Sequence, residues 1–313
     1  MANAQLSPPA GFQQSVQATG SALSSIDTDC KNIISLPTDE NTIPIIPTIG
    51  GVSTGLGPEV SPPDISTDMT AVKSTSNDWF STVRPQIVAS LQGIITFNGN
   101  FQNVYANIYP IAQQIAAGNM SQVPQFKNDL GTLQTATQTQ QTQAKQVQNA
   151  LIAYLVEVSK VQVLLSNDNT TLQNSIPGMN QQVADLQQAI DELNEKIEIE
   201  QFIPFSTIIE ALTGELENNS EQLSELNDAI DSTKQQIQYT QNAVNLLNNY
   251  QSSFGSIQSS INSLANSWEA LESDLGETIA DENISDFIAF TPALVQAASA
   301  DWQVVTNLAK TFI

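Results

Sequence analysis

The stretch that decides the fold is residues 126–165, FKNDLGTLQTATQTQQTQAKQVQNALIAYLVEVSKVQVLL. Along it, residues suited to a helix interface recur at alternating spacings of four and three, which places them on one face of an α-helix. The series consists of Phe126, Leu130, Leu133, Thr137, Gln140, Ala144, Val147, Leu151, Tyr154, Val158, Val161 and Leu165. A heptad spacing kept over so many turns predicts a long helix that packs in the manner of a left-handed coiled coil.

The same helix is expected to extend well beyond this stretch. It should begin near Ser121, where Pro124 fits the first turn. The pattern continues to Pro177 and Gly178, where a break is expected, and resumes after them. At 1.5 Å per residue, residues 121–198 would span roughly 115 Å, far more than an ordinary helix of a globular domain. This part of the chain is therefore expected to form a rod.

A second helix of similar length should lie antiparallel to the first. Apolar residues at heptad spacing run from Leu216 to Leu275, so this helix is expected to begin at about Glu215. Three shorter helices complete the pattern, over about 12–33, 66–117 and 291–312. The last of them is expected to present Leu294, Ala298, Trp302, Val305 and Leu308 on its apolar face. Pro85 and Pro110 fall inside the second of these and should bend or interrupt it.

The sequence thus predicts an all-α fold, an elongated bundle of about five long antiparallel helices with a small head at one end. The bundle would come in two parts, residues 1–198 and 215–313, with the candidate head at residues 199–214 between them. Residues 37–64 hold six prolines and four glycines, which exclude a continuous helix and indicate a linker within the first part. No stretch alternates as a strand does, so little or no sheet is expected.

The candidate head, IEQFIPFSTIIEALTG, interrupts the heptad pattern. Six apolar residues gather in it: Phe202, Ile203, Phe205, Ile208, Ile209 and Leu212. Pro204 and Gly214 would bracket a flexible excursion, and acidic residues flank it on both sides. Two interpretations stay open: the segment closes the end of the bundle, or it is a concealed membrane-contacting element. It could enter the lipid interface but is too short to span a bilayer of about 30 Å as one helix.

The composition excludes several classes of function. The chain has 313 residues, no histidine and a single cysteine, Cys30. Histidine-dependent catalysis, histidine metal ligation, internal disulfides and zinc sites with several thiolates are therefore excluded. Cys30 lies on the apolar stripe of the first helix and is interpreted as a small buried residue. No metal site and no cofactor are expected.

The net charge and the positions of the acidic residues do not favour two further classes of function, binding to polyanions and catalysis by paired carboxylates. Nine Lys and Arg stand against 32 Asp and Glu, a formal charge of -23, which does not suit binding to nucleic acid or to anionic lipid. Neighbouring carboxylates such as Asp191 and Glu192 point to different faces of a helix, so they do not form a catalytic pair. The chain is not expected to be an enzyme.

The N-terminal residues MANAQLSPPAGF lack the basic and apolar segments of a secretory signal peptide. No run approaches 18 uninterrupted apolar residues, so no permanent transmembrane helix is expected. The chain is therefore expected to be made in a soluble form, and to use another export route if it is secreted.

Residues 78–108, DWFSTVRPQIVASLQGIITFNGNFQNVYANI, resemble the second helix of the α-helical pore-forming toxins. This group includes the haemolysin BL and non-haemolytic enterotoxin components of Bacillus, and cytolysin A. The motif residues of that helix map onto Trp79, Pro85, Phe97, Asn98 and Phe101, which we interpret as packing and hinge residues. Residues 118–134 look like that family's turn into its heptad helix.

The resemblance implies a five-helix bundle that is a soluble monomer until its head enters a target membrane and the subunits assemble into a ring. By position the head is residues 199–214, and its apolar residues would be the membrane-contacting ones. Pro177, Gly178, Pro204 and Gly214 are candidate hinges, because these residue types interrupt helices. The implied partners are target-cell lipid and related toxin subunits or further copies of the chain. The implied location is extracellular, at the target-cell membrane.

This head is shorter and less apolar than the head of the pore-lining members, and acidic residues flank it. That difference favours a partner subunit of a multipartite toxin over a self-sufficient pore former. The alternative from another class is an extracellular structural or secretion-apparatus rod, such as a filament subunit or a tip translocator. Assembly discriminates between them, because a filament protein polymerises in water, whereas a toxin subunit stays monomeric until lipid or a partner arrives.

Overall fold

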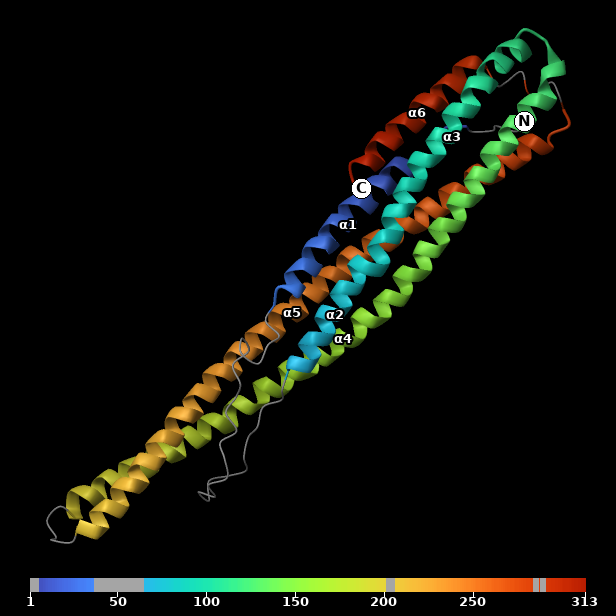
Figure 1. The fold of residues 1–313 in the computed structure, drawn as a ribbon. Coiled ribbons are helices and arrows are strands. Elements are labelled where there is room, and N and C mark those ends of the chain that lie inside the picture. The colour runs from blue at the N-terminus through green and yellow to red at the C-terminus, as the bar shows by residue number, and fades with distance from the viewer. Residues whose placement is uncertain (1–5, 37–64, 201–205, 284–286, 288–290) are drawn as a thin grey trace. The chain divides into compact units, whose positions relative to one another are not determined.

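The computed structural model describes residues 6–36, 65–200, 206–283, 287 and 291–313, which are helical nearly throughout and contain no strand (Figure 1). The helices are α1 (Phe12–Ile34), α2 (Ser66–Asp78), the π-helical turn η1 (Trp79–Val83), α3 (Arg84–Ala116), the 3-10 turn η2 (Met120–Gln122), α4 (Val123–Glu200), α5 (Ser206–Ala280) and α6 (Pro292–Lys310). The predicted all-α class is confirmed. The predicted linker, residues 37–64, lies outside the described residues.

The chain forms two compact units, each assembled from separate segments. The first consists of Met1–Lys31, Ser76–Glu157 and Asn248–Ile313, and the second of Asn32–Thr75 and Val158–Leu247. The first unit therefore holds most of α1, the whole of α3 and α6, and one part each of α4 and α5. The second unit holds most of α2 and the other parts of α4 and α5, which belong to both units because of their length.

Within the first unit, α4 and α5 run antiparallel, as predicted. The side-chain amide of Gln134 donates to Glu272 at 3.0 Å. Further along α4, Gln148 donates to Asn262, which comes earlier in α5. Because the partner in α5 moves back as the residue in α4 moves forward, the two helices have opposite directions.

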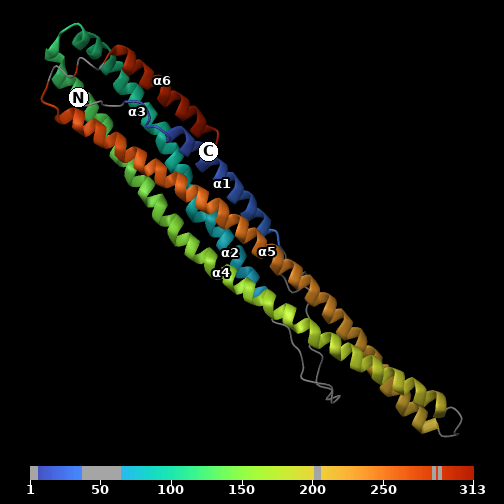
Figure 2. The same cartoon turned by 180° about the vertical axis from the view of Figure 1, so that it is seen from behind.

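The same order holds inside the second unit. The Thr240 hydroxyl donates to Asn169 Oδ1 at 3.3 Å, and the Thr233 hydroxyl lies 3.9 Å from the sulfur of Met179. The two helices are drawn side by side in both views (Figures 1 and 2). The predicted antiparallel hairpin is therefore present in each unit.

The heptad series of α4 forms a buried seam. All twelve residues of the series from Phe126 to Leu165 are less than 9% exposed. The prediction for the apolar face of α6 is wrong at one residue, because Leu294 is 57% exposed. The buried face of α6 begins one residue later, at Val295, and continues through Ala298 and Trp302 at helical spacing.

The segment predicted as one interrupted helix over 66–117 is α2, η1 and α3 in succession. The π-helical turn comes directly before α3, and Pro85 stands in the first turn of that helix, where its missing N–H is tolerated. Pro110 lies inside α3 without ending it. After α3, Gly118 has φ +91°, the left-handed conformation expected of a glycine that ends a helix.

Two helix boundaries differ from the prediction. α4 continues through Pro177 and Gly178, where a break was expected. Leu172 and Met179 on either side are fully buried, and this packing offsets the cost of an interior proline, about 3 kcal/mol. α5 begins at Ser206 rather than near Glu215, so Gly214 is an interior helix residue. A single glycine costs a helix only about 1 kcal/mol, which the neighbouring helix formers offset.

Candidate functional site

The predicted membrane-contacting segment lies only partly within the described structure. Its residues Phe202, Ile203, Pro204 and Phe205 lie outside the described residues. The segment's other apolar residues, Ile208, Ile209 and Leu212, belong to the first turns of α5, and their side chains lie outside the described part. Of the candidate hinges, Pro177 and Gly214 are exposed on α4 and α5. The roles of all these residues stay predictions.

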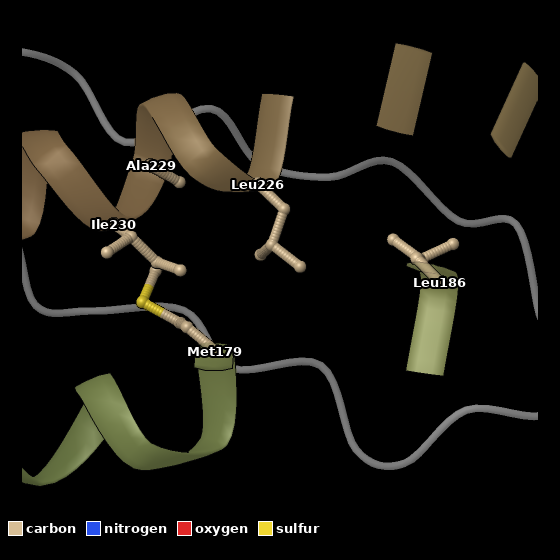
Figure 3. Close-up of a cluster of buried hydrophobic side chains, with 5 residues drawn as sticks. All are labelled: Met179, Leu186, Leu226, Ala229 and Ile230. Carbon is tan, nitrogen blue, oxygen red and sulfur yellow. The ribbon is translucent and has the colours of Figure 1, made fainter. Parts of the chain in front are cut away.

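A small apolar cluster joins α4 to α5 within the second unit. Met179 and Leu186 of α4 face Leu226, Ala229 and Ile230 of α5, and all five are at most 5% exposed (Figure 3). The sticks in Figure 3 show the Met179 side chain reaching Ile230, while Leu186 lies further along α4. Apart from Ala229, these are positions of the predicted heptad pattern, so the sequence anticipated this contact.

The rest of the α5 face in the second unit is unusually polar. Between residues 213 and 247, six of its eleven buried residues have polar side chains: Asn219, Gln222, Ser232, Thr233, Gln236 and Thr240. Between residues 248 and 280 in the first unit, only two of eleven do, Ser260 and Thr278. Because burying apolar area is the main source of stability, the polar seam stabilises its hairpin less.

The first unit, in contrast, is filled by two groups of aromatic rings. In one group Trp268 and Trp302 stack with their ring centroids 5.6 Å apart. Phe12 and Phe97 pack edge-on against Trp268, at 4.9 and 5.0 Å. Trp302 Nε1 also donates to the backbone oxygen of Leu6 at 2.8 Å, which attaches the start of the chain to α6.

The second group surrounds Trp79, the fully buried first residue of the π-helical turn. Its ring lies 6.0–6.2 Å from those of Tyr154, Tyr250 and Phe254. Aromatic pairs of this kind contribute about 0.5–1.5 kcal/mol each beyond their area. Trp79 therefore joins the α2–α3 segment to both α4 and α5.

Asp27 of α1 connects these rings to the chain's single arginine. The Trp79 Nε1 donates to Asp27 Oδ1 at 2.8 Å, and Arg84 Nε lies 2.8 Å from Oδ2 and 3.0 Å from Oδ1. The Asp27 side chain is 14% exposed, so these charge-assisted bonds are partly shielded from water. The contact fixes α1 against the π-helical turn.

Three of the other motif residues also serve packing. Phe97 and Phe101 are each 1% exposed, and the Asn98 amide, 5% exposed, donates to Gln303 of α6 at 3.4 Å. Pro85 is exposed at the start of α3. The burial of Phe97, Asn98 and Phe101 agrees with our interpretation of them as packing residues.

The single cysteine is a buried residue, as predicted. Cys30 is fully buried, and burial raises the pKa of its thiol to about 12. Burial also raises the pKa values of the neighbouring Tyr154 and Tyr250 hydroxyls. A thiol that stays neutral at physiological pH is a poor nucleophile.

Two further observations concern metals and membranes. Within the described residues no group of three or more Asp, Glu or Cys side chains could hold a metal ion. One described helix, Met120–Glu192, contains an 18-residue window apolar enough to cross a membrane, and only 28% of that window is buried. Polar and charged residues interrupt this window, so it is not an uninterrupted apolar run. Its half-exposed apolar residues include Ile152 and Val156.

Comparison with known protein families identifies the family of this chain. The family described as Bacillus haemolytic enterotoxin (HBL) matches residues 7–200, from the segment before α1 to the end of α4. The chain belongs to this family. Membership of the haemolytic enterotoxin family confirms the resemblance seen in residues 78–134, and it identifies the chain as a toxin component rather than an enzyme. A search of curated protein sequences gave no match.

Solved structures of toxin components share the fold of this haemolytic enterotoxin family member over nearly its whole length. The HblL1 toxin component of Bacillus cereus has a TM-score of 0.62 at 14% identity, with 99% of this chain and 98% of that chain covered. Soluble SmhA of the tripartite alpha-pore forming toxin of Serratia marcescens has a TM-score of 0.59 at 13% identity, covering 99% and 95%. Pre-pore AhlB of the tripartite toxin of Aeromonas hydrophila has 0.59 at 15% identity, covering 94% and 93%.

Sequence reasoning missed the contact that anchors α1. Asp27 and Arg84 are 57 residues apart, and no local pattern pairs them. The one available signal was composition, because a single arginine in so acidic a chain is a candidate for a specific carboxylate partner. The π-helical turn was also missed, although the proline that follows it was recognised as an interruption.

Proposed function

We propose that this chain is one subunit of a multi-part α-helical pore-forming toxin. It is a monomer in solution, is secreted, and changes conformation to assemble with related subunits at a target-cell membrane. The observation that carries the proposal is the family match over residues 7–200, in a chain that shares its fold with components of tripartite toxins. The structures of pre-pore and pore forms of AhlB are precedents for such a transition in that protein.

The second unit is the part that supports a conformational change. Within it a small apolar cluster joins α4 to α5 around Met179 and Ile230, and six of the eleven described buried residues of its α5 part are polar, whereas aromatic rings fix the segments of the first unit. Elements that move are drawn from the less stable parts of a protein. The hairpin of the second unit leads to residues 199–214, so its rearrangement would carry the candidate head toward lipid.

The candidate head would then contact the membrane through its apolar residues. Acidic residues flank it, and carboxylates oppose entry into hydrocarbon unless they stay in water or become protonated. Shifting such a conformational equilibrium from 1:99 to 99:1 takes about 5.5 kcal/mol of differential affinity. In this proposal lipid and partner subunits supply it together, with Pro177, Gly178, Pro204 and Gly214 as hinges.

The role of the head is tested by liposome flotation with matched charge substitutions. Phe205→Asp places a carboxylate in the candidate head, and Asn218→Asp places one on the exposed surface of α5. The proposal predicts that Phe205→Asp loses most of the membrane-bound fraction while Asn218→Asp keeps it, with unchanged helix content by circular dichroism. Equal binding by both variants would contradict the assignment of residues 199–214.

The rod alternative has no comparable support. The family match and the shared fold are with toxin components, and no filament or secretion-apparatus protein is among the similar proteins described above. A filament protein would polymerise in water without lipid. The same purified chain can be tested for that property directly.

A further inference from the structure

The acidic residues of this chain are distributed very unevenly. Of its 32 Asp and Glu, only Asp129 falls within residues 79–156, and residues 130–156 contain none. Those 27 residues form much of the first unit's part of α4. A helix face without carboxylates is therefore present on a chain whose formal charge is -23.

The exposed side of this part of α4 forms a continuous stripe. Its members follow one another at spacings of three and four, and all of them are exposed: Thr135, Gln138, Thr142, Gln146, Asn149, Ile152 and Val156. We call this the neutral stripe. Its first half borders a shallow hollow of about 520 Å³ lined by Thr and Gln side chains of α4. Its last two members are apolar and each 50% exposed. Both views show α4 at the edge of the first unit away from α6 (Figures 1 and 2).

Charged groups lie beside the stripe or at its end, as Glu157 does, rather than on it. Lys145 lies 3.6 Å from Glu269 of α5, and Glu272 accepts a hydrogen bond from Gln138 at 2.9 Å. The stripe therefore adds little repulsion to an approaching molecule of the same charge. Elsewhere, two copies of so acidic a chain repel each other when their surfaces approach.

We propose that the neutral stripe is the surface through which two copies of this chain meet, stripe on stripe, when they are concentrated on a membrane. This deepens the assembly step and rests on the proposed function. The two α4 helices would run parallel, related by a two-fold axis along their length, so that the hairpins of both copies point toward the same membrane. Gln146 stands near the middle of the stripe, so the two copies of this residue would face each other. The apolar residues Ile152 and Val156 of one copy would lie against the same residues of the other.

Disulfide trapping on vesicles tests this contact. The chain contains no histidine, so a C-terminal hexahistidine tag anchors it to neutral vesicles that carry a nickel-chelating lipid. A Gln146→Cys variant is expected to form a disulfide-linked dimer at least tenfold faster than Ser259→Cys, which is exposed on α5. The wild-type chain is the background control, because its Cys30 is buried. Equal rates, or trapping by neither variant, would overturn the proposal.

Charge substitutions at a second position test whether the trapping reports contact along the stripe rather than a property of the introduced cysteine. In the Gln146→Cys background, Thr142→Glu should slow trapping about tenfold, whereas Thr142→Lys and the distant Ser259→Glu should leave it within twofold. If Thr142→Glu and Ser259→Glu slow trapping equally, the effect is general charge repulsion and the proposal fails. A fluorescent label placed next to Ile152 and Val156 would report whether these residues enter the lipid. If they do and trapping stops, the stripe is a membrane contact instead, and the proposal fails.

Dye release from the same vesicles separates the two proposals. Gln146→Cys could trap the dimer although the chain, with or without partner subunits, has no effect on membrane permeability. That result would support the stripe contact and count against the proposed function. Dye release without trapping would sustain the proposed function and refute the stripe.

Discussion

At the scale of single residues, the most consequential contact is that of Asp27 with Trp79 and Arg84. It brings together α1, the π-helical turn and the first residue of α3 through three charge-assisted hydrogen bonds. Leaving a partly buried guanidinium without its carboxylate costs more than losing an exposed ion pair. Substitution here therefore tests how firmly α1 is attached.

We expect Asp27→Asn to lower the free energy of unfolding by about 2 kcal/mol, because it removes the charge partner of Arg84. The measurement is urea unfolding followed by tryptophan fluorescence. Asp231→Asn is the matched control, since Asp231 is 72% exposed and its pair with Lys234 should be worth less than about 1 kcal/mol. Similar effects of the two substitutions would show that the Asp27 contact is only a surface ion pair.

Cys30 makes a prediction about alkaline pH. Its pKa rises from 9.0 to about 12 in the folded chain, so above pH 9 the unfolded chain loses a proton that the folded chain keeps. Stability from this group is present below pH 9 and is lost as the pH rises toward 12. Between pH 8 and pH 10 the wild type should lose about 1 kcal/mol more than Cys30→Ala in urea unfolding. An identical loss in both proteins would contradict the burial of an un-ionised thiol.

At the scale of helices, the sequence predicted the buried faces of the helices better than the residues at which they begin and end. Alternating spacings of four and three located the buried face of α4 correctly over twelve positions, because that periodicity follows directly from helix packing. It did not locate the start of α5, since Gly214 resembles a helix end unless the stability of the surrounding helix is known. For the same reason the predicted break of α4 at Pro177 is wrong.

The polar seam of the second unit makes a prediction of its own. Thr233 is fully buried and its hydroxyl donates to the backbone oxygen of Ala229, so Thr233→Val keeps the shape and removes a buried polar group. We expect it to stabilise the hairpin by about 1 kcal/mol and to slow any membrane-dependent rearrangement. Thr137→Val in the first unit is the matched control, because Thr137 is buried and bonded to Leu133 in the same way.

Hydrogen exchange followed by mass spectrometry, with and without liposomes, measures both effects. Slower exchange over residues 213–247 and a slower response to lipid in Thr233→Val, with no change of response in Thr137→Val, would agree with opening of the second unit. If Thr137→Val alone slows the response to lipid, the first unit is the one that rearranges.

At the scale of the whole molecule, the sequence established the class of fold, the absence of catalytic histidine chemistry and the family. It did so because helical periodicity and composition are properties that one chain displays by itself. The division into two units and the Asp27 contact depend on residues far apart in the chain, so no local pattern contains them. The candidate head remains the part predicted from sequence alone.

The central claim is that this chain is a toxin subunit that stays monomeric in water and responds to membranes together with partner subunits. Size-exclusion chromatography with light scattering, with dye release from neutral liposomes in parallel, tests it most directly. We expect a single species near 33.7 kDa without lipid, and little dye release by the chain alone. Polymers that form without lipid would contradict the assignment as a toxin subunit, and rapid dye release by the chain alone would contradict its dependence on partners.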